Sequence, residues 1–353
     1  MARIRTFAQT FWEGVILIVT VKDVAKRAGV SITTVSHVIN KTRFVSTELS
    51  KRVEDAVKAL GYQPNLIARG LRKGKSYTIA ILLPDPGNPF FQMVLRGIEE
   101  HAYRHTYSLM CCNTDEDPAT ERFLISLMQQ RAIDGFIIAP TVQGKGNLSS
   151  LIKERIPLTV IDRQMESSPV DQVFSDNEGG GYQATDHLLK LGHKRIGLLA
   201  GIRGLTTIEH RLNGYRKALQ DHDIEVDEKL IIEGRSKIED GYTATKQLIG
   251  NESITAIFST NNLMTLGALR CFKEGDISYP KDISLVGFDD SEWVAAFTPS
   301  LTVVAQQPYE MGYHAGELLF EKINGKREET DTRSIELETT LIIRESTASP
   351  RKV

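Results

Sequence analysis

Cysteine is scarce in this sequence of 353 residues, and long apolar runs are missing. The three cysteines form no C-x-x-C pair, which excludes a zinc ribbon and a disulfide framework and favours a reducing compartment. No stretch approaches the roughly 20 apolar residues that a membrane-spanning helix needs. The eight histidines form no spaced cluster, and no GxGxxG, P-loop, GxSxG or HExxH motif occurs. We therefore predict a cytoplasmic protein with no membrane partner, no metal, no cofactor and no enzymatic activity.

The composition is that of a globular protein, with 41% hydrophobic and 25% charged residues, and the length predicts two or three folded units. The charges are segregated along the chain. Residues 20–75 hold twelve Lys/Arg against four Asp/Glu, a formal charge of +8, whereas residues 76–353 carry −11. A small basic segment joined to a large acidic body indicates a module that binds a polyanion. Chance clustering on a solvated surface is the alternative.

Residues 1–19 belong to neither part. Arg3 and Arg5 precede an apolar run at 15–19 that is too short for a signal peptide and is followed by no cleavage site. From Val19 onward the chain reads as an ordinary N-terminus. We therefore predict that residues 1–19 are a non-native extension created by a start site assigned too early.

Three short helices are predicted in the basic segment. Apolar residues at helical spacing begin after Thr20, and Gly29 ends the first helix. Ser31 is an N-cap for a second helix that ends near Asn40, and residues 46–60 form a third helix that stops at Gly61. Two helices around a glycine-containing turn form a helix-turn-helix, the motif that places its second helix in the major groove.

The string VAKRAGVSITTVSHVIN at residues 24–40 strongly resembles the LacI/GalR family of bacterial repressors. The segment that follows, residues 41–45, is similar to the purine-repressor branch of that family. The resemblance implies a repressor that binds double-stranded operator DNA, and it places these residues at the DNA: Ser31, Ile32, Thr33, Thr34, His37, Asn40 and Arg43.

Within that set, the resemblance assigns base contacts to Thr33, His37 and Arg43, and helix capping or phosphate contacts to Ser31 and Thr34. Thr33 and His37 are four residues apart, so they share one face of a helix. Ile32 stands where the purine repressor has a threonine, and an apolar side chain can contact only a thymine methyl group or pack against protein. The operator sequence is therefore not carried over.

Residues 64–75 resemble the hinge helix of the same family, which folds on specific DNA. There the equivalents of Leu71 from the two subunits of a dimer wedge into the minor groove, beside the basic residues Arg69 and Arg72. Gly70 lowers helix propensity by roughly 0.5–1 kcal/mol relative to alanine. We expect the hinge to be loose without DNA; a flexible basic linker is the alternative.

Strand-like and helical stretches alternate after Lys75. The predicted strands are 77–83, 108–112, 135–139, 158–161, 195–199, 256–259 and 283–288, with a further run through Val303 and Val304. Such alternation implies parallel sheets covered by helices, whose ligands bind beyond the carboxyl ends of the strands. Aromatic rings and paired polar groups follow the strands, a mixture that suits an uncharged, hydroxyl-rich ligand. The residues that this pattern predicts to bind the effector are Asn88, Phe90, Phe91, Asp162, Arg163, Arg211, Asn261, Asp289 and Gln306.

Residues 77–346 are similar to periplasmic ribose-binding proteins and to the repressor cores related to them. NPFF at 88–91, DRQ at 162–164, VGFD at 286–289 and QQP at 306–308 carry the resemblance. It adds Phe288 to the predicted effector-binding residues and implies that all of them except Arg211 contact a pentose. Arg211 matches an arginine of the LacI family. Three positions depart from the ribose-binding pattern: Ala139 replaces an asparagine, Glu209 falls near an arginine position and Ser236 near an aromatic one. The resemblance thus implies a small, ribose-like sugar rather than ribose itself.

The predicted fold is a small all-α helix-turn-helix domain followed by an α/β core of the type I periplasmic-binding-protein class, with two doubly wound parallel-sheet subdomains. The predicted boundaries are an extension at 1–19, a DNA-binding domain at 20–63, a hinge at 64–75, an effector-binding and dimerisation domain at 76–346 and a tail at 347–353. Its first subdomain takes residues 77–177 and 307–335, and its second takes 178–306 and 336–346. Residues 341–346 resemble the last strand of the family, and no heptad pattern follows residue 346, so we expect a homodimer.

The sequence thus predicts a repressor that binds a near-palindromic operator as a dimer and senses a monosaccharide. Three alternatives remain open. A sugar-binding transport receptor explains the core, although not the basic segment. The effector of the repressor is alternatively a purine, or a protein corepressor that docks on the core.

Overall fold

A computed structural model describes residues 19–41, 43–62, 74–251, 254–328 and 330–351. The chain divides into two compact units between Lys75 and Ser76. Residues 1–18 of the predicted extension lie outside the described residues, as do residues 63–73 of the predicted hinge with Arg69, Leu71 and Arg72. No helix in the described part of the chain is long and apolar enough to cross a membrane.

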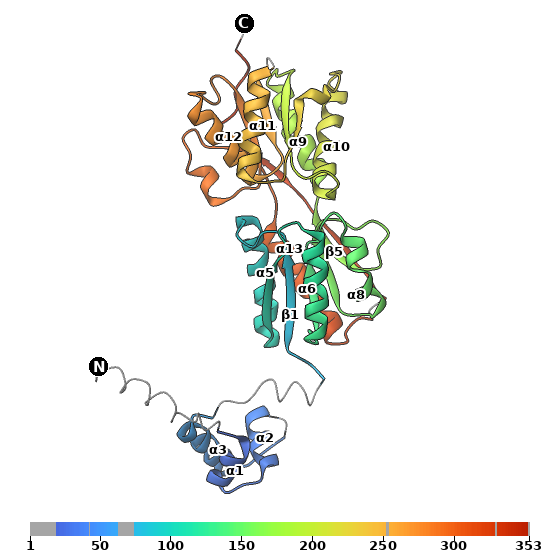
Figure 1. The fold of residues 1–353 in the computed structure, drawn as a ribbon. Helices are drawn as coiled ribbons and strands as arrows, with labels where there is room; N and C mark the ends of the chain where they lie inside the picture. The colour runs from blue at the N-terminus through green and yellow to red at the C-terminus, as the bar shows by residue number, and fades with distance from the viewer. Residues whose placement is uncertain (1–18, 42, 63–73, 252–253, 329, 352–353) are drawn as a thin grey trace, which may run out of the picture. The chain divides into compact units, whose positions relative to one another are not determined.

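Three helices make up the described part of the N-terminal unit: α1 (Val21–Ala28), α2 (Ile32–Asn40) and α3 (Thr47–Leu60) (Figure 1). Their ends follow the local sequence. The side chains of Ser31 and Ser46 accept hydrogen bonds from the first turns of α2 and α3, and Gly29 and Gly61 take left-handed conformations with φ of 63° and 59°. The three predicted helices and their capping residues are confirmed.

A small apolar core holds these helices together. Val24 of α1, Val35 of α2 and Val53 of α3 are fully buried in it. The Arg52 side chain of α3 donates a hydrogen bond to the Ala28 carbonyl oxygen at 2.7 Å, which satisfies the C-terminal end of α1. Thr33 of α2 is not part of this core and is exposed to solvent.

The C-terminal unit contains two lobes, each built on a six-stranded sheet. The sheet of the first lobe has the order β11-β5-β4-β3-β1-β2. Its strands are β1 (Thr78–Leu83), β2 (Ser108–Asn113), β3 (Gly135–Ile138), β4 (Leu158–Asp162), β5 (Asp171–Ser175) and β11 (Ser334–Leu337). Its helices are α5 (Pro89–His105), α6 (Pro118–Gln130), α7 (Gly144–Asn147), α8 (Ser149–Lys153) and α13 (Pro308–Ile323). All its strand pairs are parallel.

The sheet of the second lobe has the order β12-β10-β9-β8-β6-β7. Its strands are β6 (Ile196–Ala200), β7 (Ile231–Glu233), β8 (Ala256–Ser259), β9 (Ser284–Phe288), β10 (Thr302–Ala305) and β12 (Thr340–Ile342). Its helices are α9 (Asn177–Lys190), α10 (Thr206–Asp221), α11 (Ile238–Asn251) and α12 (Asn262–Glu274), with single 3-10 turns η1 (Glu228–Leu230) and η2 (Glu292–Ala295). Figure 1 shows α9 to α12 gathered in this lobe.

The chain passes between the lobes three times, after β5, after β10 and after β11. Helix α13, late in the sequence, therefore returns to pack beside α5 of the first lobe (Figure 1). Because the strand ends of both lobes face these crossings, side chains from distant parts of the sequence meet there.

Three helix pairs cross at glycines. A Cβ at Gly312 of α13 would overlap the Val94 carbonyl oxygen of α5, and one at Gly97 of α5 would overlap the Tyr309 carbonyl oxygen of α13. The pairs α9/α10 and α11/α12 repeat the arrangement, at Gly181 with Gly214 and at Gly241 with Gly267. In each pair these glycines let the backbones of the two helices come into contact.

The predicted fold class is confirmed, with corrections to its details. The second sheet is not wholly parallel, because the edge strand β12 runs antiparallel to β10. The strands β5, β7 and β11 are absent from the predicted set. Residues 336 and 337 pair with β5 in the first lobe rather than in the second.

Each omission has a physical reason. Strands β7 and β11 are short, partly exposed edge strands. Strand β5 is fully buried although Asp171, Gln172 and Ser175 lie in it. The Asp171 carboxylate is neutralised by Lys322 at 3.2 Å and by Arg327 at 2.5 Å, contacts that only the tertiary fold supplies.

Candidate functional site

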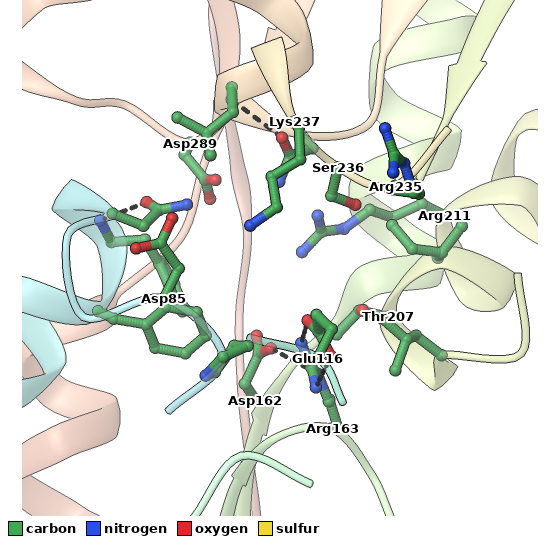
Figure 2. A pocket seen from close by; sticks show the side chains of 18 of the residues that line it. Asp85, Glu116, Asp162, Arg163, Thr207, Arg211, Arg235, Ser236, Lys237 and Asp289 are labelled. Carbon is green, nitrogen blue, oxygen red and sulfur yellow. Dashed lines mark hydrogen bonds and ion pairs between the residues drawn. The ribbon is translucent and has the colours of Figure 1, made fainter. Parts of the chain in front are cut away.

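A cavity of about 630 Å³, counted with its open mouth, lies between the two lobes of the core. Figure 2 shows charged side chains from both lobes converging on it. Of the ten predicted effector-binding residues, all except Phe288 line this cavity. The remaining lining residues are Pro84, Asp85, Glu116, Leu205, Thr207, Ile208, Arg235, Ser236, Lys237 and Leu263.

The aromatic wall of the cavity is set by the start of α5. The Asn88 side chain caps this helix by accepting from the Phe90 backbone N–H at 3.0 Å, and Pro89 occupies the first turn. The Phe90 and Phe91 rings meet edge to face, with centroids 5.1 Å apart. The cap thus places an apolar surface at the carboxyl end of β1.

A pair of buried amides joins the two lobes beside this wall. Asn88 Nδ2 donates to Asn262 Oδ1 at 3.1 Å, and Asn262 Nδ2 donates back to Asn88 Oδ1 at 2.8 Å. Asn261, which also lines the cavity, has its Oδ1 turned to the Leu263 and Met264 backbone N–H groups as the cap of α12. The amides of Asn88 and Asn261 therefore serve the fold as well as the cavity.

The first lobe contributes an ion pair at the end of β4. Arg163 Nη1 donates to Glu116 Oε2 at 2.9 Å, its Nη2 donates to Glu116 Oε1, and Nη1 also reaches the Pro140 carbonyl oxygen at 2.6 Å. Burial works to lower the pKa of the Arg163 guanidinium, but Glu116 and Asp162 more than offset it, so that pKa is raised. Burial raises the pKa of Asp162, against the opposing attraction of Arg163 and Arg211.

Arg211 projects from α10 of the second lobe. Its Nε donates to Asn177 Oδ1 at 2.8 Å and its Nη1 to the Thr260 carbonyl oxygen at 2.6 Å. The guanidinium carbon lies 3.6 Å from the centre of the Phe288 ring. Burial lowers the pKa of Arg211, against the attraction of Asp289.

The structure thus places Phe288 differently from the sequence prediction. Phe288 lies behind Arg211 and does not line the cavity. The reason is the alternation of side chains at the end of β9: Phe288 turns into the apolar core of the second lobe, and Asp289 turns toward the cavity.

Asp289 and Gln306 meet where the chain passes between the lobes. Gln306 Nε2 donates to Asp289 Oδ1 at 2.6 Å. Burial raises the pKa of Asp289, against the attraction of Arg211. Gln306 Oε1 and Arg163 Nε are buried without a hydrogen-bond partner among the described residues. Gln306 therefore brings to the cavity an acceptor with unused hydrogen-bonding capacity, whereas Arg163 Nε lies 3.5 Å from Asp162 Oδ2 in an ion pair.

Sequence reasoning missed several charged residues of this cavity. Lys237 of the second lobe donates to Asp115 Oδ1 of the first lobe at 2.9 Å, and Glu116 holds Arg163. Arg235 pairs with Asp240 at 3.3 Å. Asp115 and Glu116 follow β2, and their position after a strand is the same signal that predicted the other lining residues.

The predicted DNA-binding residues gather around α2. Ser31 is its N-cap, with the Thr34 backbone N–H donating to its hydroxyl at 3.0 Å. Ile32, Thr33 and Arg43 are exposed, whereas Thr34 and His37 are half-buried. The side chain of Asn40 lies outside the described residues. The exposed residues combine the basic Arg43, which suits a phosphate backbone, with the hydroxyl of Thr33 and the apolar side chain of Ile32.

Among the described residues, no group of three or more His, Cys, Asp or Glu side chains is arranged to hold a metal ion.

Comparisons with known proteins agree with this architecture. The family model "Bacterial regulatory proteins, lacI family" matches residues 20–65, and "Periplasmic binding protein-like domain" matches residues 185–347. The HTH-type transcriptional repressor PurR of Haemophilus influenzae is 35% identical over 333 residues, which cover 94% of this chain and 99% of that protein.

Two solved structures are similar over most of their length. The Lac repressor dimer bound to operator and the anti-inducer ONPF is 26% identical, with a TM-score of 0.81 over 94% of this chain and 99% of that one. A LacI family transcriptional regulator from Enterococcus faecium with bound ribose is 29% identical, with a TM-score of 0.72 over 78% of this chain and 100% of that one.

Proposed function

The chain belongs to the lacI family of bacterial regulatory proteins, and from this membership we propose that it is a repressor whose hold on operator DNA responds to a monosaccharide in the cavity of its core. The operator is near-palindromic, because the two-fold symmetry of a homodimer is mirrored in its half-sites. Thr33, His37 and Arg43 contact bases, and Leu71 of the hinge wedges into the minor groove.

The chemistry of the cavity carries the sugar assignment. Asp162 and Asp289 supply acceptors, Arg163 Nε supplies a donor and Gln306 Oε1 supplies a further acceptor. Adjacent hydroxyl groups of a sugar donate and accept at once, so they match this mixture. Phe90 offers a face to the apolar side of the ring.

Communication between the cavity and DNA follows from the placement of these groups on both lobes. A ligand that bridges Asp162 of the first lobe and Asp289 of the second favours the closed arrangement of the core. The shift in DNA affinity is limited by the difference in ligand affinity between the two arrangements. An inducer favours the arrangement with poor DNA affinity, and a corepressor favours the opposite one.

A purine effector is the second candidate, and the 35% identity with PurR over almost the whole chain favours it. The cavity favours the sugar instead. Its aromatic lining comes from Phe90 and Phe91 of the single helix α5, standing edge to face. A planar base gains most from aromatic surface on its faces, and the other lining groups offer hydrogen bonds and charge.

Thermal unfolding of the full chain with pentoses, hexoses and purine bases decides between these candidates. A ligand at 100 times its Kd stabilises the native state by about 2.7 kcal/mol, which raises the melting temperature measurably. We expect a monosaccharide to do so and to change affinity for operator DNA. Stabilisation by hypoxanthine or guanine alone would replace the sugar assignment with the purine one. No response to any small molecule would favour the protein corepressor.

A further inference from the structure

Glu116 occupies the anion-binding side of Arg163, a buried guanidinium of the cavity. Its two carboxylate oxygens accept hydrogen bonds from both terminal nitrogens of Arg163. This two-pronged geometry is the one by which a guanidinium binds a phosphate or a carboxylate of a ligand. The protein thus fills with its own side chain the place that a ligand phosphate would take.

The turn that carries Glu116 is held at both ends. The Thr114 backbone N–H donates to the Leu83 carbonyl oxygen at 2.8 Å, and Asp117 caps α6 through the Ala119 and Thr120 backbone N–H groups. Asp115 and Glu116 both adopt left-handed backbone conformations, with φ of 49° and 59°. Non-glycine residues adopt this conformation at an energetic cost, and here it directs both carboxylates toward basic groups.

The other cations of the cavity are committed to the protein as well. Arg211 donates to Asn177 and Thr260, Arg235 pairs with Asp240, and Lys237 pairs with Asp115. Meanwhile Asp162 and Asp289 present two further carboxyl groups to the same space. An incoming phosphate dianion meets these carboxylates while each basic side chain already has an acceptor.

We infer that Glu116 is a specificity-determining residue that restricts the cavity to uncharged polyhydroxylated ligands and excludes sugar phosphates. This inference deepens the proposed function and rests on it for the identity of the ligand class. Glu116 pairs with the Nη1 and Nη2 side of Arg163, and the Asp162 Oδ2 atom lies 3.5 Å from its Nε. Both sides of this guanidinium therefore already meet a protein carboxyl group.

The test replaces Glu116 by glutamine in the full chain, which keeps the size of the side chain and removes its charge. Inorganic phosphate is the probe, titrated calorimetrically, with ribose and ribose 5-phosphate as a second pair. We expect Glu116→Gln to bind phosphate at least ~10-fold more tightly than the wild type, a change of about 1.4 kcal/mol. The basic N-terminal unit is identical in both proteins, so phosphate bound there cancels in the comparison.

Asp85→Asn is the matched control. Asp85 lines the same cavity, but its carboxylate accepts from the Gly87 backbone N–H at 2.9 Å and forms no ion pair among the described residues. Removing this charge lowers the negative potential of the cavity without releasing a guanidinium. We therefore expect no gain in phosphate affinity.

Two results would overturn the inference: no gain in phosphate affinity in a folded Glu116→Gln protein, or an equal gain in Asp85→Asn. If Glu116→Gln does not fold, Glu116→Ala carries the same expectation, and Glu116→Asp should still exclude phosphate. A gain in phosphate affinity without any response of the wild type to sugars would refute the sugar effector and leave the role of Glu116 standing.

Discussion

The helical N-terminal unit and the α/β core hold their candidate binding residues in opposite ways. In the N-terminal unit these residues fall within a short stretch around α2, and Ile32, Thr33 and Arg43 are exposed. In the core the lining residues run from Pro84 to Gln306, and the central charged side chains of Asp162, Arg163, Arg211 and Asp289 are buried.

The difference follows from what each surface binds. A DNA phosphate backbone is long and charged, so exposed side chains on one rigid helix meet it with little desolvation. A small ligand must be surrounded, which brings polar groups out of water. Each buried charge then needs a partner. In the core these partners come from other parts of the chain, such as Glu116 in the loop after β2 and Asn177 of α9.

Gly312→Val tests the dependence of the core on distant contacts and should have the largest effect. Any Cβ at Gly312 overlaps the Val94 carbonyl oxygen of α5, so the two helices must separate. We expect a loss of about 3 kcal/mol in the free energy of unfolding, at the upper end of overpacking costs because the obstacle is backbone. Urea unfolding followed by circular dichroism measures it.

The matched control is Gly146→Ala, because a Cβ at Gly146 meets open space. Hydrogen exchange in α3 should be unchanged in both variants, because the residues that cap α3 and those that pack against it all belong to the N-terminal unit. Faster hydrogen exchange in α3 of Gly312→Val would contradict this comparison, because it would mean that the stability of the N-terminal unit depends on the core.

Asp289→Asn tests how much folding stability the protein loses by burying a carboxylate that binds the effector. We expect the stabilisation by the effector, about 2.7 kcal/mol at 100 times its Kd, to disappear. The ligand-free variant should melt higher than the wild type near pH 7, because burial raises the pKa of Asp289 and disfavours its ionised form in the folded state. Asparagine also tolerates the left-handed backbone at this position, where φ is 76°.

The pH dependence of stability tests the direction of the pKa shift of Asp289. A carboxyl whose folded pKa lies above its unfolded value gains stability as the pH falls through the folded pKa, and asparagine does not titrate. The advantage of Asp289→Asn should therefore shrink as the pH is lowered from about 7 toward about 5. Thermal melts at several pH values measure it; an advantage that grows at low pH would contradict the assignment.

Thr33→Ala and Ser31→Ala together sharpen the account of the N-terminal unit, with the smallest expected effects. Thr33 is exposed, so its loss should weaken operator binding by about 10-fold while changing stability by less than about 0.5 kcal/mol. Ser31 caps α2, so its loss should cost about 1 kcal/mol of stability. Fluorescence anisotropy with an operator selected from random duplexes and hydrogen exchange in α2 separate the two. Equal destabilisation by both variants would contradict the assignment.

Local sequence predicted the elements whose signals are local. Gly29, Ser31 and Gly61 act within one helical turn, so their caps were readable without a fold. The apolar runs of β1, β4 and β9 were likewise evident, and the residues that follow them were predicted to meet. Strand β5 was not predicted, because its buried Asp171 is tolerated only beside Lys322 and Arg327, far along the chain.

By itself, the sequence determined the two-part organisation, the three helices of the N-terminal unit and most of the residues that line the cavity. Helical capping and strand periodicity act over a few residues, which is why a single chain reveals them. The tertiary structure alone decided that Glu116 holds Arg163, that Lys237 reaches Asp115 and that Phe288 supports Arg211 from behind. Electrostatic pairing in a buried space depends on distance in three dimensions, and no spacing along the chain encodes it.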